Sequence, residues 1–523
     1  MKLLKILVPS LLVALLWSCN KEVEKSPALP ALEPLRLDET AGSWTPVILS
    51  NNYSVQVPLA APAATTSDAY KAELTTIKNA QAGLTKQQRD VIAYWSVGGV
   101  IRWNQIMREL VARYNLPPAP REDGTYVFPD AENPFADPAF PFANPPYAAR
   151  AYAYVSMAQY DALKAAWYYK YLYNRAAPYT VDASVQALVP RTTLPTYPSE
   201  DAVLSGVTAE MLKILFPASV EQITKLAADQ RNAALWSGKA APSDISAGLA
   251  LGKSVASVIT APGSRFRTDG MGNAVGNAAL WKELQDSVGF GDFYKSAQIP
   301  WLSLESPPRP PMLPNFGKVL TWNISPAQLV AERPAPPPLT SSEKMKQELA
   351  EVKKYADNAT REELRITHKW ADGAGTYAPP GHWNHIAEES VVNARFSEVR
   401  AARAYALLNM ALHNAGVGCW EAKYYYFNPR PSQLDPSIKT KTGLPNFPSY
   451  TSGHSTFSAS ASVVLGYLFP DRAQFFTSEA KEASMSRLYG AIHYRSDIEV
   501  GYSHGVLLAA YTVNFAQSDG AGN

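Results

Sequence analysis

The chain has 523 residues, of which 46% are hydrophobic and 18% are charged, and its formal net charge at pH 7 is +2. This length exceeds what one hydrophobic core usually organises, so two domains are expected, and the apolar content is enough for a sizeable core. The near-neutral charge gives no indication of a nucleic-acid partner, so we expect function to reside in a local site.

The first residues, MKLLKILVPSLLVALLWSCNKE, combine two lysines, a short apolar run and a cysteine directly after a small residue. The run is too short for a comfortable membrane span and is typical of a secretory signal, with an uncleaved anchor as the alternative. The pattern resembles the lipobox of bacterial lipoproteins, with residues 1–18 as signal peptide and Cys19 as the lipidated residue. We therefore expect an exported protein, anchored by lipid in the bacterial cell envelope at the outer membrane, with a flexible tether over residues 19–60. This anchor is the only membrane contact that we predict.

The chain is an internal duplication. Residues 148–252 align without a gap on residues 401–505 at a constant offset of 253, and 32 of the 105 pairs are identical. A second block starting at Ser67 aligns on the block starting at Ser342 at an offset of 275. The difference between the offsets corresponds to a proline-rich insertion within residues 117–146 of the first copy. Such self-similarity predicts two copies of one structural unit.

The repeated blocks have helical character. In TSSEKMKQELAEVKKYA, Thr340 and Glu343 have capping-box spacing, and Met345, Leu349 and Val352 recur at helical intervals. Between the copies, PWLSLESPPRPPMLPNF and ERPAPPPL contain too many prolines to continue a helix or a central strand. We predict an all-α fold of two duplicated bundles, with a first repeat over residues 61–260, a proline-rich linker over residues 261–335 and a second bundle over residues 336–523.

The two copies differ in their functional groups. All seven histidines lie in the second half: His368, His382, His385, His413, His454, His493 and His504. At matched positions the first copy has Asp201 for His454, Ala240 for His493, Ala177 for Arg430 and Ala234 for Arg487, but keeps Lys170 for Lys423 and Asp244 for Asp497. We predict that the first repeat is a non-catalytic packing partner and that the second bundle carries the chemistry.

Three segments of the second copy combine positive charge, histidine and small residues: KYYYFNPRP, PSYTSGHS and SRLYGAIHYRSD. Taken singly, a Lys or Arg is usually solvated, and Ser452 is usually a helix cap. Together the segments supply three cations, Lys423, Arg430 and Arg487, and the N–H groups of a loop that enters a helix. A buried tetrahedral oxyanion needs such groups. Gly453 would let the backbone approach that anion closely.

His493 and Asp497 are four residues apart, so on a helix they share one face. A carboxylate that accepts a hydrogen bond from one ring nitrogen fixes the tautomer and leaves the other nitrogen as nucleophile or metal ligand. Standing alone, the pair would be interpreted as an exposed helical ion pair. The first copy keeps Asp244 without a histidine, which leaves a capping role open for Asp497.

The order Lys, six residues, Arg-Pro, then Ser-Gly-His, then Ser-Arg, five residues, His resembles the signature of the type 2 phosphatidate phosphatase and vanadium haloperoxidase superfamily. The doubled bundle resembles its haloperoxidase branch, typified by vanadium chloroperoxidase. The resemblance implies that five residues bind the oxygens of vanadate or phosphate: Lys423, Arg430, Ser452, Gly453 and Arg487. It also implies that His493 is the covalent axial ligand of the metal, oriented by Asp497, and that His454 is the acid–base residue.

The resemblance leaves two activities open. A haloperoxidase would oxidise halide with hydrogen peroxide at a vanadate bound to His493, with His454 assisting proton transfer, and would pass hypohalous acid to a small organic acceptor. An acid phosphatase would use His493 to attack a phosphoester and His454 to protonate the leaving alcohol. A non-catalytic envelope protein that binds an anion is a third hypothesis.

Two features favour the haloperoxidase. Trp420 and Phe447 resemble the aromatic residues that line the halide side of fungal-type chloroperoxidases, although Trp167 at the matched position in the first copy also fits a plain core role for Trp420. Beyond the N-terminal signal, no segment has the pattern of the membrane-spanning helices found in integral lipid phosphatases. Cys419, the one cysteine besides Cys19, is expected to be a buried small residue rather than a catalytic thiol.

Residues 368–389, HKWADGAGTYAPPGHWNHIAEE, hold three histidines together with Asp372. Their prolines and glycines predict a loop, from which ligand geometry cannot be derived. A second metal site is one interpretation of this segment, and we favour instead a segment that lines the entrance to the anion site.

Overall fold

The computed structural model describes residues 29–116, 121–123, 144–276, 280 and 298–522, and every regular element in these ranges is a helix. The predicted all-α fold is confirmed. The predicted signal peptide, Cys19 and most of the proline-rich insertion lie outside the described residues.

The described part of each half contains seven long helices in the same order. In the first half these are α3 (Asp68–Ala82), α4 (Lys86–Trp95), α5 (Gly99–Tyr114), α6 (Pro145–Tyr173), α8 (Glu200–Leu215), α9 (Val220–Trp236) and α10 (Pro242–Thr260). In the second half they are α14 (Glu343–Asn358), α15 (Arg361–Lys369), α16 (Ala378–Asn393), α17 (Glu398–Tyr426), α19 (Gly453–Leu468), α20 (Ala473–Tyr489) and α21 (Arg495–Ser518). The pairs α6/α17, α8/α19 and α9/α20 begin and end at positions 253 apart, as the duplicated sequence predicts.

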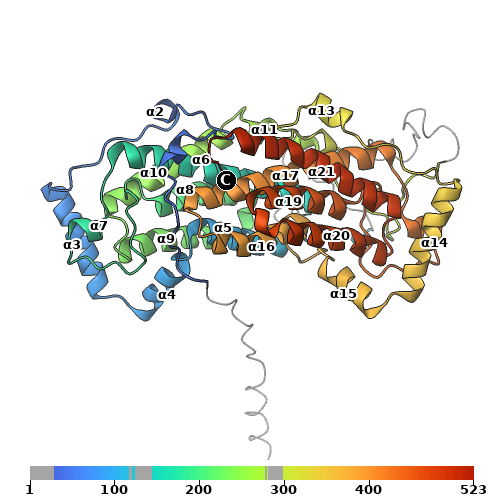
Figure 1. The fold of residues 1–523 in the computed structure, drawn as a ribbon, viewed down its shortest axis with the longest axis horizontal. Coiled ribbons are helices and arrows are strands. Elements are labelled where there is room, and N and C mark those ends of the chain that lie inside the picture. Colours follow the sequence, from blue (N-terminus) through green and yellow to red (C-terminus); the bar gives the residue numbers. More distant parts are fainter. Residues whose placement is uncertain (1–28, 117–120, 124–143, 277–279, 281–297, 523) are drawn as a thin grey trace, which may run out of the picture.

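Short elements connect these helices. They are η1 (Glu39–Ser43), α2 (Tyr53–Gln56), α7 (Pro178–Val181), η2 (Pro217–Ser219), α11 (Arg265–Thr268), η3 (Met271–Asn273), η5 (Phe316–Lys318), α13 (Pro326–Ala331), α18 (Pro431–Leu434) and η6 (Pro470–Arg472). Figure 1 shows the resulting elongated molecule, with α3 near one end of the long axis and its counterpart α14 near the other.

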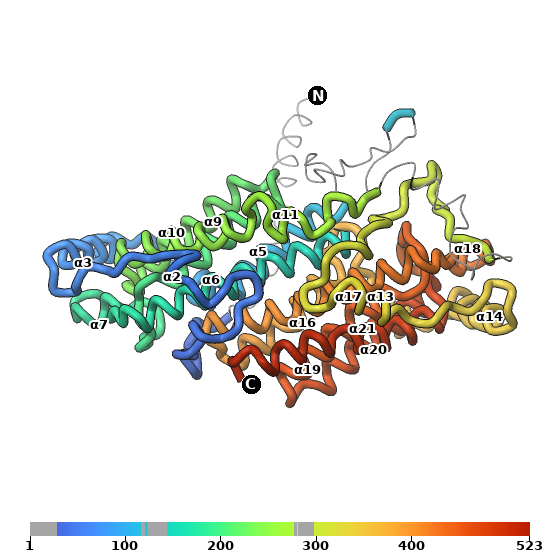
Figure 2. Tube along the Cα trace, turned by 90° about the horizontal axis from the view of Figure 1, so that it is seen from above, coloured from blue at the N-terminus to red at the C-terminus, as the bar shows by residue number. Residues whose placement is uncertain are grey.

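The two halves meet along their longest helices, α6 and α17, which run through the middle of the molecule (Figures 1 and 2). Both helices are buried around almost their whole circumference and are rich in alanine, which lets neighbouring helices approach closely. One continuous hydrophobic cluster contains residues of both halves. The bundles are therefore not separate units on a linker, because they share a core.

Matched glycines allow two helices to cross closely in each half. A Cβ on Gly252 of α10 would lie 2.3 Å from the carbonyl oxygen of Val203 on α8. A Cβ on Gly505 of α21 would lie 2.3 Å from the carbonyl oxygen of Thr456 on α19. These closely crossing helices bring the N-terminus of α21 against that of α19.

One stretch, residues Pro242–Thr268, is long and apolar enough to cross a membrane by length and composition alone. It contains α10, which packs closely against α8 through Gly252 and lines the core with Leu251, Val255 and Ile259. We therefore interpret it as a core helix.

The prediction of a flexible tether over residues 19–60 is wrong for residues 29–60, which pack on the protein. The buried carboxylate of Asp161 on α6 accepts hydrogen bonds from the backbone N–H groups of Val47, Ile48 and Leu49 at 2.6–2.9 Å. This buried carboxylate thus holds the segment along α6.

Two local predictions also need correction. Helix α14 is capped by Ser342, whose side chain accepts the N–H of Met345, whereas Thr340 bonds to Gln298. Residues 378–389, predicted as loop, belong to helix α16, because Pro379 and Pro380 lie in its first turn, where no N–H donor is needed.

Candidate active site

The segments singled out in the sequence meet at one place in the second half. Lys423 lies in the last turn of α17, Arg487 in the last turn of α20, and Asp497 in the first turn of α21. The remaining residues lie in or beside connecting loops: Arg430 before α18, Ser452, Gly453 and His454 at the start of α19, and His493 before α21. All except Gly453 and His454 are buried, and these two line the cavity described below.

His493 is held between a carboxylate and a guanidinium. Its Nδ1 lies 2.9 Å from Oδ2 of Asp497, and its Nε2 lies 3.0 Å from Nη1 of Arg430. Arg430 can only donate, so Nε2 accepts and Nδ1 carries the proton. Burial and the charges of Arg430, Lys423 and Arg487 hold the pKa of His493 well below its usual value. The imidazole is therefore neutral, with its Nε2 lone pair directed at Arg430.

Asp497 also has a structural role. Its Oδ2 accepts the backbone N–H of Tyr494 at 3.1 Å, which caps α21, and also accepts the hydroxyl of Ser449. In the first half Asp244 caps α10 in the same way, accepting the N–H of Ala241 at 2.7 Å. The capping role left open by the sequence is thus present in both copies, and orientation of a histidine is added in the second.

Lys423 donates hydrogen bonds to the loop that leads into α19. Its Nζ donates to the carbonyl oxygens of Pro448, Ser449 and Thr451 at 2.5–2.9 Å. Burial lowers the pKa of Lys423 to about 7; the nearby Arg430 charge also lowers it, while Cys419 and Asp497 act in the opposite sense. This lysine fixes the loop and, as a buried cation, needs a counter-charge.

The two arginines are equally desolvated. Arg430 donates to the carbonyl oxygens of Phe447 and Ile492, and Arg487 donates to that of Thr367 and to the hydroxyl of Ser486. Burial lowers the pKa of each guanidinium to about 10. Three buried cations face the nearby carboxylates of Asp497 and Asp372, and this excess of positive charge favours an anion.

His454 has a carboxylate partner that the sequence did not identify. Its Nε2 lies 3.4 Å from Oδ2 of Asp372, an ion-pair contact rather than an aligned hydrogen bond, and Nδ1 of His382 lies 3.0 Å from Oδ1 of the same carboxylate. Burial and the Arg487 charge lower the pKa of His454 to about 4, although Asp372 opposes them. Burial would raise the pKa of Asp372, but its contacts with His382 and His454 hold it well below the usual value.

The segment around Asp372 is anchored by the first half. Asn115, just after α5, donates to the carbonyl oxygens of Gly373 and Thr376 at 3.0 Å. His385 accepts from Arg108 of α5 instead of facing the cavity. Among the described residues no group of three or more His, Cys, Asp or Glu side chains is placed to hold a metal ion.

A cavity of about 360 Å³ opens onto His454, Arg487 and His493. One wall is aromatic, where Trp420 and Phe447 pack with ring centroids 5.0 Å apart. Other parts of the wall come from outside the second bundle: Asn115, Leu116, Asn144 and Pro145 of the first half, and Arg309 and Met312 of the linker. Sequence reasoning missed these residues. Cys419 is buried beside Thr451, as expected for a small core residue.

The start of α19 could hold a tetrahedral oxyanion. Ser452 is its cap, accepting the N–H of Ser455, and the N–H groups of a first helical turn have no partner within the helix. A Cβ on Gly453 would meet nothing nearer than the Trp420 ring at 3.8 Å, so glycine leaves space at the cavity wall. Space, helix N–H groups and buried cations fit vanadate or phosphate, and Nε2 of His493 supplies a neutral ligand or nucleophile.

Comparisons with known proteins agree with this arrangement. Residues 402–520 match the family model of the PAP2 superfamily, whereas no curated protein matches the chain. A bacterial vanadium-dependent iodoperoxidase is similar in structure, with a TM-score of 0.55 and 23% identity over 79% of this chain and 96% of that one. A holo-type bacterial vanadium-dependent chloroperoxidase has a TM-score of 0.50 and 14% identity over 75% and 96%. Residues 402–520 thus match the PAP2 superfamily model, and the chain as a whole has a fold similar to that of the solved vanadium-dependent haloperoxidases.

Proposed function

We propose that the protein is a vanadium-dependent haloperoxidase that oxidises halide with hydrogen peroxide. The observation that carries the proposal is the neutral His493, whose Nε2 accepts from Arg430 beside a cavity with an aromatic wall, with the buried Lys423 and Arg487 close enough to lower its pKa. The similarity of the whole doubled fold to an iodoperoxidase and a chloroperoxidase supports haloperoxidase over phosphatase.

Vanadate would be held by the residues that the site brings together. His493 would bind the metal through Nε2, and the oxygens would be neutralised by Lys423, Arg430, Arg487, the Ser452 hydroxyl and the Gly453 N–H. Bound vanadate would supply a Lewis-acid centre for the activation of hydrogen peroxide. The protein would keep His493 in one tautomer through Asp497 and would exclude bulk water by burial.

His454 would handle the protons. Conversion of hydrogen peroxide and halide to hypohalous acid and water consumes one proton, so the site needs a group that can deliver it. His454 faces the cavity and is neutral near pH 7, with Asp372 behind it to stabilise the protonated form. Phe447 and Trp420 would form the halide side, and Phe447 is specific to the second copy, because Leu194 occupies the matched position in the first.

Acid phosphatase activity is the alternative, favoured by the PAP2 match over residues 402–520. In that reaction Nε2 of His493 would attack the phosphorus of a phosphomonoester, and His454 would protonate the leaving alcohol. The same cations would neutralise the phosphoryl oxygens. A protein that only binds an anion would use the same pocket without turnover.

Two assays on one preparation separate these functions. Apo protein given orthovanadate should halogenate a diketone dye in the presence of peroxide and bromide or chloride. Hydrolysis of p-nitrophenyl phosphate without halogenation, with vanadate acting only as inhibitor, would replace the haloperoxidase with the phosphatase. Inactivity in both assays would favour the third hypothesis, a protein that binds an anion without turnover. His493→Ala should abolish either activity while the helical circular dichroism spectrum stays unchanged.

We further propose that the protein is exported and lipidated on Cys19 at the bacterial outer membrane. The sequence of residues 1–19 supports this proposal, which independent labelling can test. Cells given radioactive palmitate should label the wild-type protein and not Cys19→Ser, and equal labelling of both would contradict the lipid anchor.

A further inference from the structure

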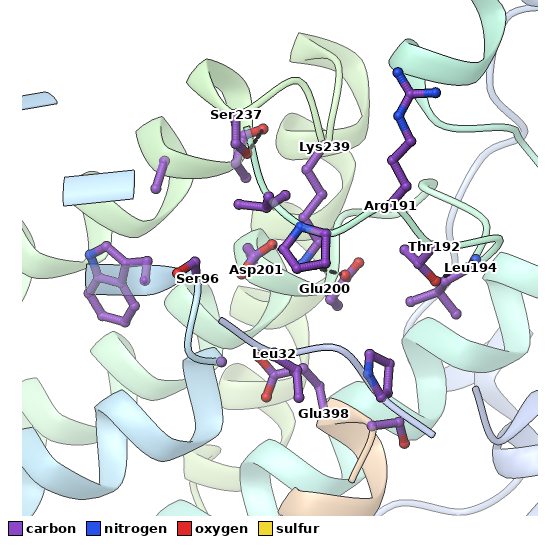
Figure 3. Close-up of a pocket in the computed structure, with 18 of the residues that line it drawn as sticks. Leu32, Ser96, Arg191, Thr192, Leu194, Glu200, Asp201, Ser237, Lys239 and Glu398 are labelled. Atoms are coloured by element: carbon purple, nitrogen blue, oxygen red, sulfur yellow. Dashed lines mark hydrogen bonds and ion pairs between the residues drawn. The ribbon is translucent and has the colours of Figure 1, made fainter. Parts of the chain in front are cut away.

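The first half keeps a cavity at the position that matches the candidate active site (Figure 3). Ten of its lining positions fall, at the offset of 253, on lining positions of the larger cavity in the second half, among them the pairs Trp167/Trp420, Leu194/Phe447 and Asp201/His454. The volume is smaller, about 70 Å³ against about 360 Å³. The difference raises the question of what fills the space in the first half.

The backbone around the two cavities is the same. The N–H of Ser199 donates to the carbonyl oxygen of Asp244 at 3.0 Å, and that of Ser452 donates to the carbonyl oxygen of Asp497 at 2.9 Å. Ser199 and Ser452 each cap the helix that follows. The next residue, Glu200 in the first half and Gly453 in the second, therefore occupies an equivalent place.

The buried lysine is also retained. Nζ of Lys170 donates to the carbonyl oxygen of Pro195 at 2.6 Å, as Nζ of Lys423 donates to that of the matched Pro448. Lys423 continues with two further carbonyls, whereas Lys170 pairs with Oε2 of Glu200 at 2.7 Å. The first-half lysine thus has a carboxylate where the second-half lysine has none.

A second lysine completes the arrangement. Nζ of Lys239 lies 2.8 Å from Oε1 of Glu200 and 2.8 Å from Oδ2 of Asp201. Figure 3 shows Glu200, Asp201 and Lys239 together in the cavity, with Glu398 of α17 nearby. Burial would raise the pKa of Glu200, but the two lysines hold it well below its usual value, so the carboxylate is ionised.

We propose that the first half retains an oxyanion-binding site whose anion is built in: the Glu200 carboxylate, held by Lys170 and Lys239, takes the place of a tetrahedral oxyanion such as phosphate. Each oxygen of Glu200 meets one lysine, as two oxygens of a phosphate would. This site lacks the groups that we assign to catalysis, because Ala240, Ala177 and Ala234 occupy the positions that match His493, Arg430 and Arg487.

Removal of the Glu200 side chain tests this directly. Glu200→Gly introduces the residue of the matched second-half position and leaves Lys170 without a carboxylate, while Lys239 keeps its contact with Asp201. With inorganic phosphate as probe, E200G should lose thermal stability and regain it in phosphate, with a larger rise in Tm than wild type. The measurement is made at pH 6, because burial and the Asp201 charge raise the pKa of Glu398 in the cavity wall to about 7, so that this carboxyl is largely protonated. Equilibrium dialysis should find one more phosphate per chain in E200G than in wild type. Equal Tm shifts and equal stoichiometry would overturn the proposal.

Two variants serve as controls in the first half. Glu200→Gln keeps a side chain in the cavity and should gain no additional phosphate site, and Lys170→Gln added to E200G should remove the extra site. An extra phosphate in either variant would contradict the assignment of Glu200 and Lys170. If E200G is too unstable to purify, its refolding yield becomes the readout: phosphate should raise the yield of E200G more than that of wild type, and an equal effect on both overturns the proposal.

The reciprocal variant tests the same idea in the second half. Gly453→Glu should place a carboxylate beside Lys423 and weaken phosphate binding there at least tenfold, because the open space next to Trp420 accepts the side chain. Unchanged phosphate affinity in G453E would count against the built-in anion. Since these measurements follow binding and stability, their outcome does not depend on which reaction the second half catalyses.

Discussion

Nδ1 of His493 lies 2.9 Å from Oδ2 of Asp497, and this carboxylate has a matched partner without a histidine in the first half, Asp244. Both carboxylates accept the backbone N–H three residues before them and so begin a helix, but Asp497 alone also fixes an imidazole. The duplication therefore provides an internal control that separates the structural role of this aspartate from its role in the site.

Asp497→Asn and Asp244→Asn should differ in activity, although each weakens one helix cap. Loss of the cap should cost each variant about 1 kcal/mol of unfolding free energy, and D244N should lose more, because Asp244 also forms a buried ion pair with Arg175 at 3.1 Å. D497N should in addition lower turnover about 10- to 100-fold, because the amide no longer holds His493 in the tautomer with a free Nε2. Urea denaturation and steady-state assays on the two variants measure both effects. Equal turnover in D497N and D244N would contradict the proposal that Asp497 orients His493.

Most residues of the site could be predicted from the sequence because they lie in short segments with fixed spacing. Lys423 and Arg430 are joined by one loop, as are Arg487 and His493, and the absence of Arg430, Arg487 and His493 from the first copy marked the second as special. The repeat likewise predicted that the two halves contain matching helices, and three pairs of them begin and end 253 residues apart.

The rest depends on how the two halves pack. Asp372 reaches His454 only because α16, which follows the loop that holds Asp372, packs against α19, and Asn115 supports this loop from the other half of the chain. Asn144 and Pro145 line the cavity because α6 extends from one half to the site of the other. Such contacts between distant segments cannot be predicted from spacing in the sequence. The linker residue Met312 was not predicted because its proline-rich stretch has no regular pattern.

Asp372→Asn should slow the reaction and move its pH dependence. The carboxylate stabilises the protonated form of His454, so its loss should lower the pKa of His454 further below about 4 and shift the acid limb of activity to lower pH. We expect a 10- to 100-fold fall in kcat, as is typical when the partner of an acid–base group is removed. A pH–rate profile measures both, with His382→Gln as a control that keeps the carboxylate. An unshifted pH–rate profile and a normal kcat in D372N would show that the protonation of His454 does not depend on the Asp372 carboxylate.

Oxyanion affinity should fall with rising pH above neutrality. Because burial lowers the pKa of Lys423 to about 7, the free protein loses this cation above that pH, and a bound anion must restore the proton. Affinity for tungstate, whose charge is constant between about pH 6 and 9, should fall roughly tenfold per pH unit above 7. Isothermal titration calorimetry in buffers of different ionisation enthalpy should detect the proton uptake. Lys423→Gln should bind weakly and lose this dependence; a pH-independent affinity of the wild type would refute the lowered pKa.

Glu398 should make the contact between the halves sensitive to pH. Its buried carboxylate on α17 accepts the N–H groups of Gly99 and Val100 at the start of α5, and burial, aided by the Asp201 charge, raises its pKa to about 7. The folded state therefore holds a proton that the unfolded chain releases near pH 4.5.

The pH dependence follows in sign and size. The contribution of Glu398 is fully present below about pH 4.5 and is lost as pH rises through 7, with an upper bound of roughly 3 kcal/mol for a shift of this size. Glu398→Gln keeps an acceptor oxygen and cannot ionise, so the difference in unfolding free energy between E398Q and wild type should change in favour of E398Q from pH 5 to pH 7.5. Denaturant unfolding at both pH values measures this difference. Glu210→Gln, on the surface of α8, provides the control for loss of one charge and should show no such trend. A difference that stays constant across the range would mean that Glu398 is ionised throughout and that the proton is not held at this contact.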